Sequence, residues 1–467
     1  MQLTRQRLAL FLHFALLLTL AETRGSAQDK PEAPQPRSRP TAEAPTPQQT
    51  SSDSQPLEIS LARAIELARA NSTVYNAALT EAGSAQEDRT QARDALLPQV
   101  SYNNEYLYTQ ANQLGQVRFI ANNAVHEYVS QGNVHESIDV AAVAAFRRTA
   151  AASAVARARA EIASRGLVVT VVQSYFAAIA AQNKLDAARR AAEEGDRFFQ
   201  LTQQLEHGGE VAHSDTIKAE LQAQDRRRQL QEAQLALLNT RLDLAVLIFS
   251  NLQDNFILTE NLAASAPLPT LEEVQQQAAR DNPDLRAALE TVNVTNHGVA
   301  AARAEYLPSL GLDYFYGIDA PQFALNSTAN GQKLSNLGSS ALASLNFPVW
   351  NWGATQSRIR QAQLQQKQAK LELSYAQRKL IAEIRSLYAQ AETSLNQLAG
   401  LQRSAELAAE SQRLTTLRYR DGEATVLEVV DSQTAFVQAN NNYQDGAVRY
   451  RVALASLQTL TGVLTNP

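Results

Sequence analysis

Proline is absent from two very long stretches, and this constrains the fold more than any other feature of the sequence. None occurs between Pro98 and Pro267, or between Pro348 and Pro467. Because proline breaks the interior of a helix, both stretches permit unusually long helices. They are also rich in the strong helix formers Ala, Leu, Gln, Glu, Arg and Lys. The sequence therefore predicts two pairs of long helices, over residues 147–205 and 215–249 and over residues 354–418 and 425–460.

Apolar residues recur at regular steps in the middle of the second proline-free stretch. The steps are three and four residues, at Leu380, Ile384, Leu387, Ala391, Leu395 and Leu398. This spacing is typical of the seam along which helices pack as a coiled coil. It favours a mainly helical fold whose long helices lie alongside one another.

Four shorter segments show the period of two that is typical of strands. Two of them alternate apolar with small or polar residues, at Val100, Tyr102, Tyr106 and Tyr108 and at Leu310, Leu312, Tyr314, Tyr316 and Ile318. Two further strands are predicted over residues 135–146 and 339–349. Each is about the 9–11 residues that a tilted membrane strand requires. The polar segments between paired strands, 109–133 and 319–337, are too long for tight turns.

The only two tryptophans, Trp350 and Trp352, lie where the fourth predicted strand ends. Aromatic residues at that position are typical of the girdle at which a barrel meets the membrane surface. Packing in a protein core explains them equally well on spacing alone.

The N-terminal segment has the pattern of a secretory signal. Arg5 and Arg7 precede an apolar run of about 14 residues, shorter than the roughly 20 that span a bilayer. Gly25-Ser26-Ala27 is a plausible cleavage site, so residues 1–27 are predicted to be a signal peptide. Seven of the 15 prolines follow within residues 28–56, which predicts an extended linker without a core. No later segment has 18 consecutive apolar residues, so we expect no membrane-spanning helix after the signal.

The two halves of the chain repeat each other. Arg93 with Leu97-Pro98 recurs as Arg303 with Leu307-Pro308, and Gly209-Glu210 recurs as Gly422-Glu423. We expect one repeat over residues 57–264 and a second over residues 265–467, each contributing two strands. A closed membrane barrel needs at least about eight strands, and four would leave edges that lipid does not tolerate. If the strands enter a membrane, several subunits must share the barrel.

Three stretches of the sequence resemble the TolC family of outer-membrane efflux channels. They are the Arg-x-x-x-Leu-Pro entries at Arg93 and Arg303, the segment Asn346-Phe347-Pro348-Val349-Trp350-Asn351-Trp352-Gly353, and the turn from Tyr419 to Gln433. The resemblance covers about residues 57–462. It implies a homotrimer with a shared outer-membrane β-barrel, four strands per subunit, and a long periplasmic cylinder of helices. It also implies partnership with a periplasmic adaptor and an inner-membrane transporter, in efflux or type I secretion, in the outer membrane of a diderm bacterium.

The same resemblance assigns roles to residues in the turns between long helices. Glu428 and Asp431 correspond to the family's acidic pore aperture, while Ser214, Asp215 and Tyr419 correspond to an inter-helix latch in which Tyr419 bonds to Asp215. Gly209 and Gly422 mark the turns. From the residues alone, Glu428 and Asp431 are more simply an acidic pair that complements a helix start. One departure is Ala424, where some members have an arginine that adds a second latch. Another is Phe146-Arg147-Arg148-Thr149, which replaces the proline-aromatic-glycine handover found in the second repeat.

Other functional classes find little support. Cysteine is absent, which excludes disulfides, thiolate metal sites, thiol catalysis and a lipidated cysteine. A net charge of −5 gives no reason to expect a nucleic-acid partner. The six histidines have no metal-ligand spacing, and no nucleophile or phosphate-loop motif is present, so we expect no enzyme and no cofactor. Arg226-Arg227-Arg228 is interpreted as a solvated helix face, with a contact to the adaptor as the weaker alternative. A secreted coiled-coil structural or adhesion protein remains the alternative, although it has no use for the alternating strands.

Overall fold

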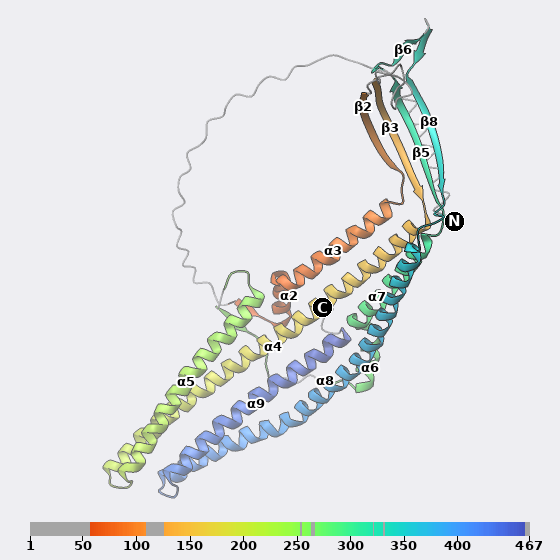
Figure 1. The fold of residues 1–467 in the computed structure, drawn as a ribbon. Coiled ribbons are helices and arrows are strands. Elements are labelled where there is room, and N and C mark those ends of the chain that lie inside the picture. The colour runs from red at the N-terminus through yellow and green to blue at the C-terminus, as the bar shows by residue number, and fades with distance from the viewer. Residues whose placement is uncertain are drawn as a thin grey trace, which may run out of the picture. The chain divides into compact units, whose positions relative to one another are not determined.

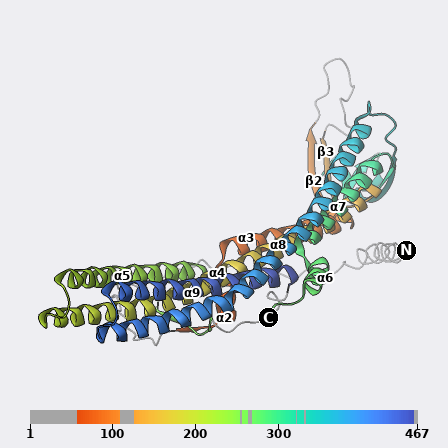
Figure 2. The ribbon, with the colours of Figure 1, turned by 90° about the horizontal axis from the view of Figure 1, so that it is seen from below.

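The computed structural model describes residues 57–108, 126–252, 255–262, 267–320, 322–329 and 332–462, which lie within one compact unit that starts at Gln55. The predicted signal peptide and linker lie outside the described residues. Within the described part, four helices exceed 35 residues: α4 (Val140–His207), α5 (His213–Ile248), α8 (Ala354–Arg420) and α9 (Val426–Thr461). They correspond to the four predicted long helices. They run side by side as the pairs α4/α5 and α8/α9 (Figure 1), and Figure 2 shows the four together from below.

The predicted seam of α8 lies in the helical core. Leu380 and Ile384 are buried with Ala391, and they pack with Val274 of α6 (Leu271–Asp281) and Leu457 of α9. A second cluster joins α4, α5 and α9 to α2 (Leu61–Asn71) and to the parallel strand pair β1 (Leu57–Ile59) and β4 (Phe256–Leu258). The mid-section of the helices is therefore where most of the apolar core is found.

One window of α4 is apolar enough, by length and composition, to cross a membrane, although it contains no uninterrupted run of 18 apolar residues. Of that window, 44% is buried within the chain, and α4 packs against α5, α7 (Pro283–Ala304), α3 (Thr73–Asp94) and α9. At 68 residues α4 is about 100 Å long. Its packing identifies the apolar window as part of the helical core.

The repeat seen in the sequence is a repeat of structural elements. Helices α2 and α6 both have 11 residues, α3 and α7 both have 22, and α5 and α9 both have 36, while α4 and α8 have 68 and 67. Ser72 and Asn282 occupy matching positions and cap α3 and α7, accepting from the amides of Tyr75 and Leu285. The two halves therefore have the same architecture as well as related sequences.

A four-stranded antiparallel sheet combines two strands from each half, in the order β2-β3-β5-β8. Its members are β2 (Gln99–Tyr108), β3 (His126–Ile138), β5 (Ser309–Ala320) and β8 (Leu337–Asn346). The central pair β3–β5 joins the two halves, and β2 and β8 are the two edges (Figure 1). A small hairpin of β6 (Asn326–Ala329) and β7 (Gln332–Ser335) lies between β5 and β8 in the chain.

The second predicted strand was placed too late in the sequence. It was expected over residues 135–146, but β3 ends at Ile138 and α4 begins at Val140. The Asp139 side chain accepts from the amide of Ala142 at 2.6 Å and caps α4. A capping aspartate followed by an alanine-rich run favours the helix over continuation of the strand.

Candidate functional site

The four-stranded sheet has one predominantly apolar face. The register aligns Val100 with Val134 and Tyr106 with Tyr128, and it aligns Val134 with Tyr314 and Tyr314 in turn with Ala341. Because side chains alternate across a strand, the alternating residues predicted from sequence share this face. Its members include Val100, Tyr102, Tyr106, Tyr108, Tyr128, Val134, Ile138, Leu310, Leu312, Tyr314, Tyr316, Ile318, Leu337, Ala341, Ala343 and Leu345.

Three polar groups on the apolar face, those of Tyr102, Ser130 and Asn104, pair with one another. The Ser130 hydroxyl donates to Asn104 Oδ1 at 2.7 Å and lies 2.7 Å from the Tyr102 hydroxyl. The opposite face is mostly small or polar, and there His135 Nδ1 lies 2.7 Å from Asp313 Oδ1 across the β3–β5 pair. One apolar and one polar face is the pattern of strands with lipid on one side and an aqueous interior on the other.

Both tryptophans of the predicted membrane interface lie on the surface, just after β8. Trp350 is 75% exposed and Trp352 is 89% exposed, and their rings form an edge-to-face pair with centroids 5.7 Å apart. Trp352 has a positive φ of 56°, and Gly353, which follows it at the start of α8, has a φ of 82°. Packing within the core of a single chain does not account for these rings, since the subunit leaves them uncovered.

At the other end of the long helices, both pairs turn in the same way (Figure 1). The amide of Glu423 donates to Arg418 O at 2.8 Å, and the amide of Glu210 donates to Leu205 O at 2.9 Å. Gly422 and Gly209 precede these amides with φ of 77° and 74°. This is the Schellman ending, in which a left-handed glycine lets the chain satisfy the last carbonyls of a helix. Both glycines thus occur where a turn requires them.

Tyr419 of the predicted latch is buried against the first helix pair. Its ring packs on Phe198 with centroids 5.0 Å apart, and its hydroxyl donates to Thr202 Oγ1 at 3.5 Å. Burial raises the pKa of Tyr419, and the nearby charge of Asp215 raises that pKa further. The Tyr419–Asp215 bond implied by the family stays a prediction. The structure adds Phe198 and Thr202, whose positions 217 residues and more before Tyr419 give no local sequence signal.

The other latch residues lie at the start of α5. Ser214 is exposed, and Asp215 is half-buried with its Oδ1 3.3 Å from Lys218 Nζ. Beside them, His213 Nδ1 lies 2.7 Å from Glu206 Oε1. The neighbouring side chains of Thr216 and, next, His213 lower the pKa of Glu206.

The acidic pair of α9 lies just beyond the second turn. Glu428 forms a capping box with Thr425, because each side chain accepts from the other residue's backbone amide, at 3.3 Å and 3.2 Å. Glu428 Oε2 also lies 3.5 Å from Arg418 Nη1. Asp431 is exposed and, three residues on, occupies the same side of the helix. Glu428 therefore has a structural role within the subunit, at the start of α9.

The arginine run in α5 departs from its predicted role at one position. Arg226 is only 3% exposed and donates to Thr434 Oγ1 of α9 at 3.0 Å and to Gln229 Oε1 at 2.8 Å. Arg227 and Arg228 pair with Asp196 and Asp225 on the surface. Burial lowers the pKa of Arg226. The interpretation as a solvated face was therefore wrong for Arg226, which connects the two helix pairs.

No group of three or more potential metal ligands gathers anywhere in the described ranges. The features that the two repeats place together are a two-faced sheet with open edges, a pair of surface tryptophans, and two matched helix turns. These features define a class of protein with a sheet suited to a membrane and long paired helices outside it.

The comparisons with known proteins agree with this class. Residues 274–463 match the family model described as outer membrane efflux protein. The chain is 23% identical over 411 residues to the outer membrane protein TolC of Vibrio cholerae, covering 87% of this chain and 91% of that protein. It is 24% identical over 412 residues to the alkaline protease secretion protein AprF of Pseudomonas aeruginosa, covering 85% and 83%. These matches confirm the resemblance to outer-membrane efflux channels that the sequence indicated.

Solved structures share the fold. The Campylobacter jejuni CmeC outer membrane channel matches with a TM-score of 0.72 at 18% identity, over 86% of this chain and 85% of that one. The open state of the Neisseria gonorrhoeae MtrE outer membrane channel matches with a TM-score of 0.71 at 18% identity, over 91% and 97%. At this level of identity the likeness establishes the architecture of the subunit.

Proposed function

We infer that the chain is one subunit of a homotrimeric exit channel in the outer membrane, which passively conducts substrates delivered by an inner-membrane transporter and a periplasmic adaptor. The observation that carries this function is the register of the sheet, which collects apolar side chains on one face and polar ones on the other. Relatives named for protease secretion, pyoverdine export and cation efflux support a conduit whose cargo differs between members.

Closure of the barrel requires other subunits. The edge strands β2 and β8 each present one unpaired side within the described sheet. An unpaired strand edge is too costly in lipid, and one chain has half the strands of the smallest closed membrane barrel. Pairing of β8 with β2 of the next subunit closes a ring, and three subunits supply enough strands.

The two faces of the sheet determine which side of the barrel wall meets lipid. The tyrosine- and leucine-rich face meets lipid, and the face with His135 and Asp313 lines the aqueous interior. Trp350 and Trp352 then lie at the periplasmic membrane interface, where the barrel passes into the helical cylinder. Their exposure in the isolated subunit supports this position.

We propose that Glu428 and Asp431 line the narrow inner end of the conduit. Three copies of the pair would focus a negative potential and favour cations. Ser214, Asp215 and Tyr419 would hold that end closed, and Arg226 bridges the same two helix pairs through Thr434. No catalytic step is needed for this function.

The first test is the mass of the detergent-extracted protein after membrane fractionation, measured by light scattering. We expect a membrane-bound assembly of three subunits that forms conducting pores in planar bilayers. A soluble monomer absent from membranes would contradict the shared barrel and favour the secreted coiled-coil alternative.

A further inference from the structure

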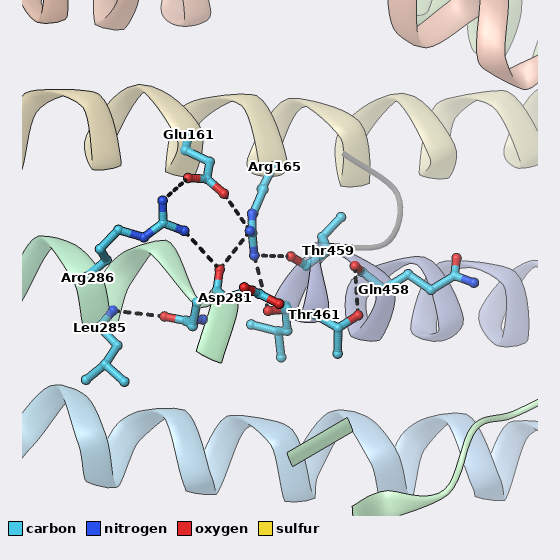
Figure 3. Close-up of polar contacts among 10 residues, drawn as sticks. Glu161, Arg165, Asp281, Leu285, Arg286, Gln458, Thr459 and Thr461 are labelled. Atoms are coloured by element: carbon cyan, nitrogen blue, oxygen red, sulfur yellow. Dashed lines mark hydrogen bonds and ion pairs between the residues drawn. The ribbon is translucent and has the colours of Figure 1, made fainter. Parts of the chain in front are cut away.

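A buried arginine connects the two halves of the chain. Arg165 of α4 donates from Nη1 to the main-chain oxygens of Thr459 and Leu460, at 2.6 and 3.1 Å, in the last turn of α9. Its Nη2 donates to Asp281 O at 2.8 Å and to Glu161 Oε1 at 2.6 Å (Figure 3). Arg165 is 7% exposed. This arginine of the first half thus binds the ends of two helices of the second half.

The contact has a clear physical purpose. The last carbonyls of a helix have no partner within the helix, and a cation near that end is also favoured by the helix dipole. Arg165 supplies both donors and charge. The fit is close, because a Cβ on Gly462, which ends α9 with a φ of 81°, would lie 3.1 Å from Arg165 Nη2.

The internal repeat places a second arginine at the same position of the second half. At an offset of 213 residues, Arg165 corresponds to Arg378 of α8, and neighbouring positions agree at Leu167 and Leu380, Tyr175 and Tyr388, and Asn183 and Asn396. The same offset carries α5 onto α9 without a gap, from His213 and Val426 to Ile248 and Thr461. Thr459 and Leu460 therefore correspond to Val246 and Leu247.

The equivalent contact, between Arg378 and the end of α5, is not made within the described part of the chain. Arg378 is exposed, and its one hydrogen bond there runs from Nε to Ser374 O of its own helix at 3.4 Å. Val246 is 66% exposed, whereas its counterpart Thr459 is 5% exposed. The carbonyls of Val246 and Leu247 lie in the last turn of α5, where the helix itself supplies no donor.

The other contacts between the halves indicate that the partner of Arg378 is a second copy of the chain. Within the chain, first-half elements β3 and α4 contact second-half elements β5, α7 and α9. Replacing each of these elements by its counterpart in the other half gives three further pairs, β8 with β2, α8 with α3 and α8 with α5. None of the three makes a comparable contact among the described residues. All three would form at once against a second copy of the chain, because β8 and α8 lie on one side of the subunit and β2, α3 and α5 lie on the other (Figure 1).

We propose that Arg378 of one subunit caps helix α5 of the next subunit, donating to the main-chain oxygens of Val246 and Leu247 as Arg165 does within its own chain. Asn71, the last residue of α2, corresponds to Asp281 and offers the third carbonyl. Ser374 replaces Glu161, so the clamp between subunits lacks the carboxylate that steadies Arg165. This proposal rests on the proposed trimer.

Cysteine cross-linking tests the contact directly, because the natural chain contains no cysteine. The double variant Arg378→Cys with Val246→Cys is treated with a short bismaleimide in membranes and separated under denaturing conditions. We expect covalent dimers and trimers. The matched variant Arg165→Cys with Thr459→Cys should cross-link within one chain and stay a monomer, and Arg378→Cys with Leu427→Cys should not cross-link.

A second readout separates the contact from general folding. We expect Arg378→Met to lower the temperature at which the detergent-solubilised trimer dissociates, while Arg403→Met, on the surface of the same helix, leaves it unchanged. A trimer by light scattering that shows no Arg378–Val246 cross-link, or whose Arg378→Met variant dissociates like the natural protein, would overturn this proposal and leave the proposed function standing. A monomer by light scattering would instead contradict the trimer itself.

Discussion

The hydroxyl of Tyr419, in the last turn of α8, donates to Thr202 of α4 at 3.5 Å. The two residues belong to different halves of the chain and lie next to the turns at the end of the long helices. This contact, together with the Phe198 ring beneath Tyr419, joins the two helix pairs close to the acidic residues of α9. Whether the inner end of the conduit stays closed should depend on it.

We expect Tyr419→Phe to loosen the inner end slightly and Tyr419→Ala to open it. The first variant removes a long hydrogen bond, worth about 0.5–1.5 kcal/mol at most, but keeps the ring on Phe198. The second also removes a buried aromatic ring, which costs about 3–5 kcal/mol. Single-channel conductance in planar bilayers should rise in the order natural protein, Phe variant, Ala variant. Equal conductance for all three would remove Tyr419 from the latch, and exposed Tyr375→Phe provides the control.

The same contact should weaken at alkaline pH. Burial and the charge of Asp215 raise the pKa of Tyr419 above its ordinary value of 10.0. The neutral hydroxyl is therefore favoured by folding, and its contribution is present below pH 10 and lost as the pH rises through the raised pKa. Conductance of the natural protein should increase above that pH, and Tyr419→Phe should lack this component. An identical alkaline response in the variant would rule out Tyr419 as its source.

Ion selectivity should depend on the charge of Glu428 and Asp431. Glu428→Gln keeps the capping box, since glutamine can take the same position, so the double variant Glu428→Gln with Asp431→Asn changes charge and preserves shape. We expect the reversal potential under a salt gradient to move toward that of an unselective pore. Glu406→Gln with Glu410→Gln, on α8, should keep the natural value. An unchanged reversal potential in the first double variant would place the aperture elsewhere.

Any ordinary side chain at the two turn glycines should lower stability. Gly422→Ala and Gly209→Ala meet no neighbour within 4 Å, so their cost is that of a left-handed backbone, about 1–2 kcal/mol each. Gly298→Ala, inside helix α7 and also free of neighbours, should instead stabilise by about 0.5–1 kcal/mol. The apparent melting temperatures of purified Gly422→Ala and Gly209→Ala should therefore lie below that of the natural protein, and that of Gly298→Ala should lie above it. A rise for Gly422→Ala would contradict the Schellman geometry.

Intrinsic fluorescence can locate the membrane interface, since Trp350 and Trp352 are the only tryptophans. In lipid vesicles we expect emission at shorter wavelength than in the unfolded protein and strong quenching by lipids brominated near the headgroup. Lipids brominated near the bilayer centre should quench less. If neither brominated lipid quenches the fluorescence and iodide in the water phase does, the two tryptophans lie away from the membrane. Trp350→Phe and Trp352→Phe separate the two contributions.

Local patterns predicted most of the secondary structure. Long proline-free stretches gave α4, α5, α8 and α9, and period-two alternation gave β2 and β5, because both signals depend on neighbours a few residues apart. The start of α4 was placed wrongly because a strand end and a capped helix start overlap at Asp139. The turn glycines were predicted from the repeat, and their positive φ angles agree with that role.

The sequence by itself thus determined the helices, the strands, the duplication and the resemblance to a family. Only the tertiary structure decided which distant residues meet. Arg226 is buried because Gly195 of α4 gives it room and Thr434 Oγ1 of α9 accepts a hydrogen bond from it, while its neighbours Arg227 and Arg228 remain on the surface. Arg165 and Arg378 occupy equivalent positions in the repeat, yet one is buried on helix ends and the other is exposed. Burial is set by what packs against a side chain across hundreds of residues, and no local pattern carries that information.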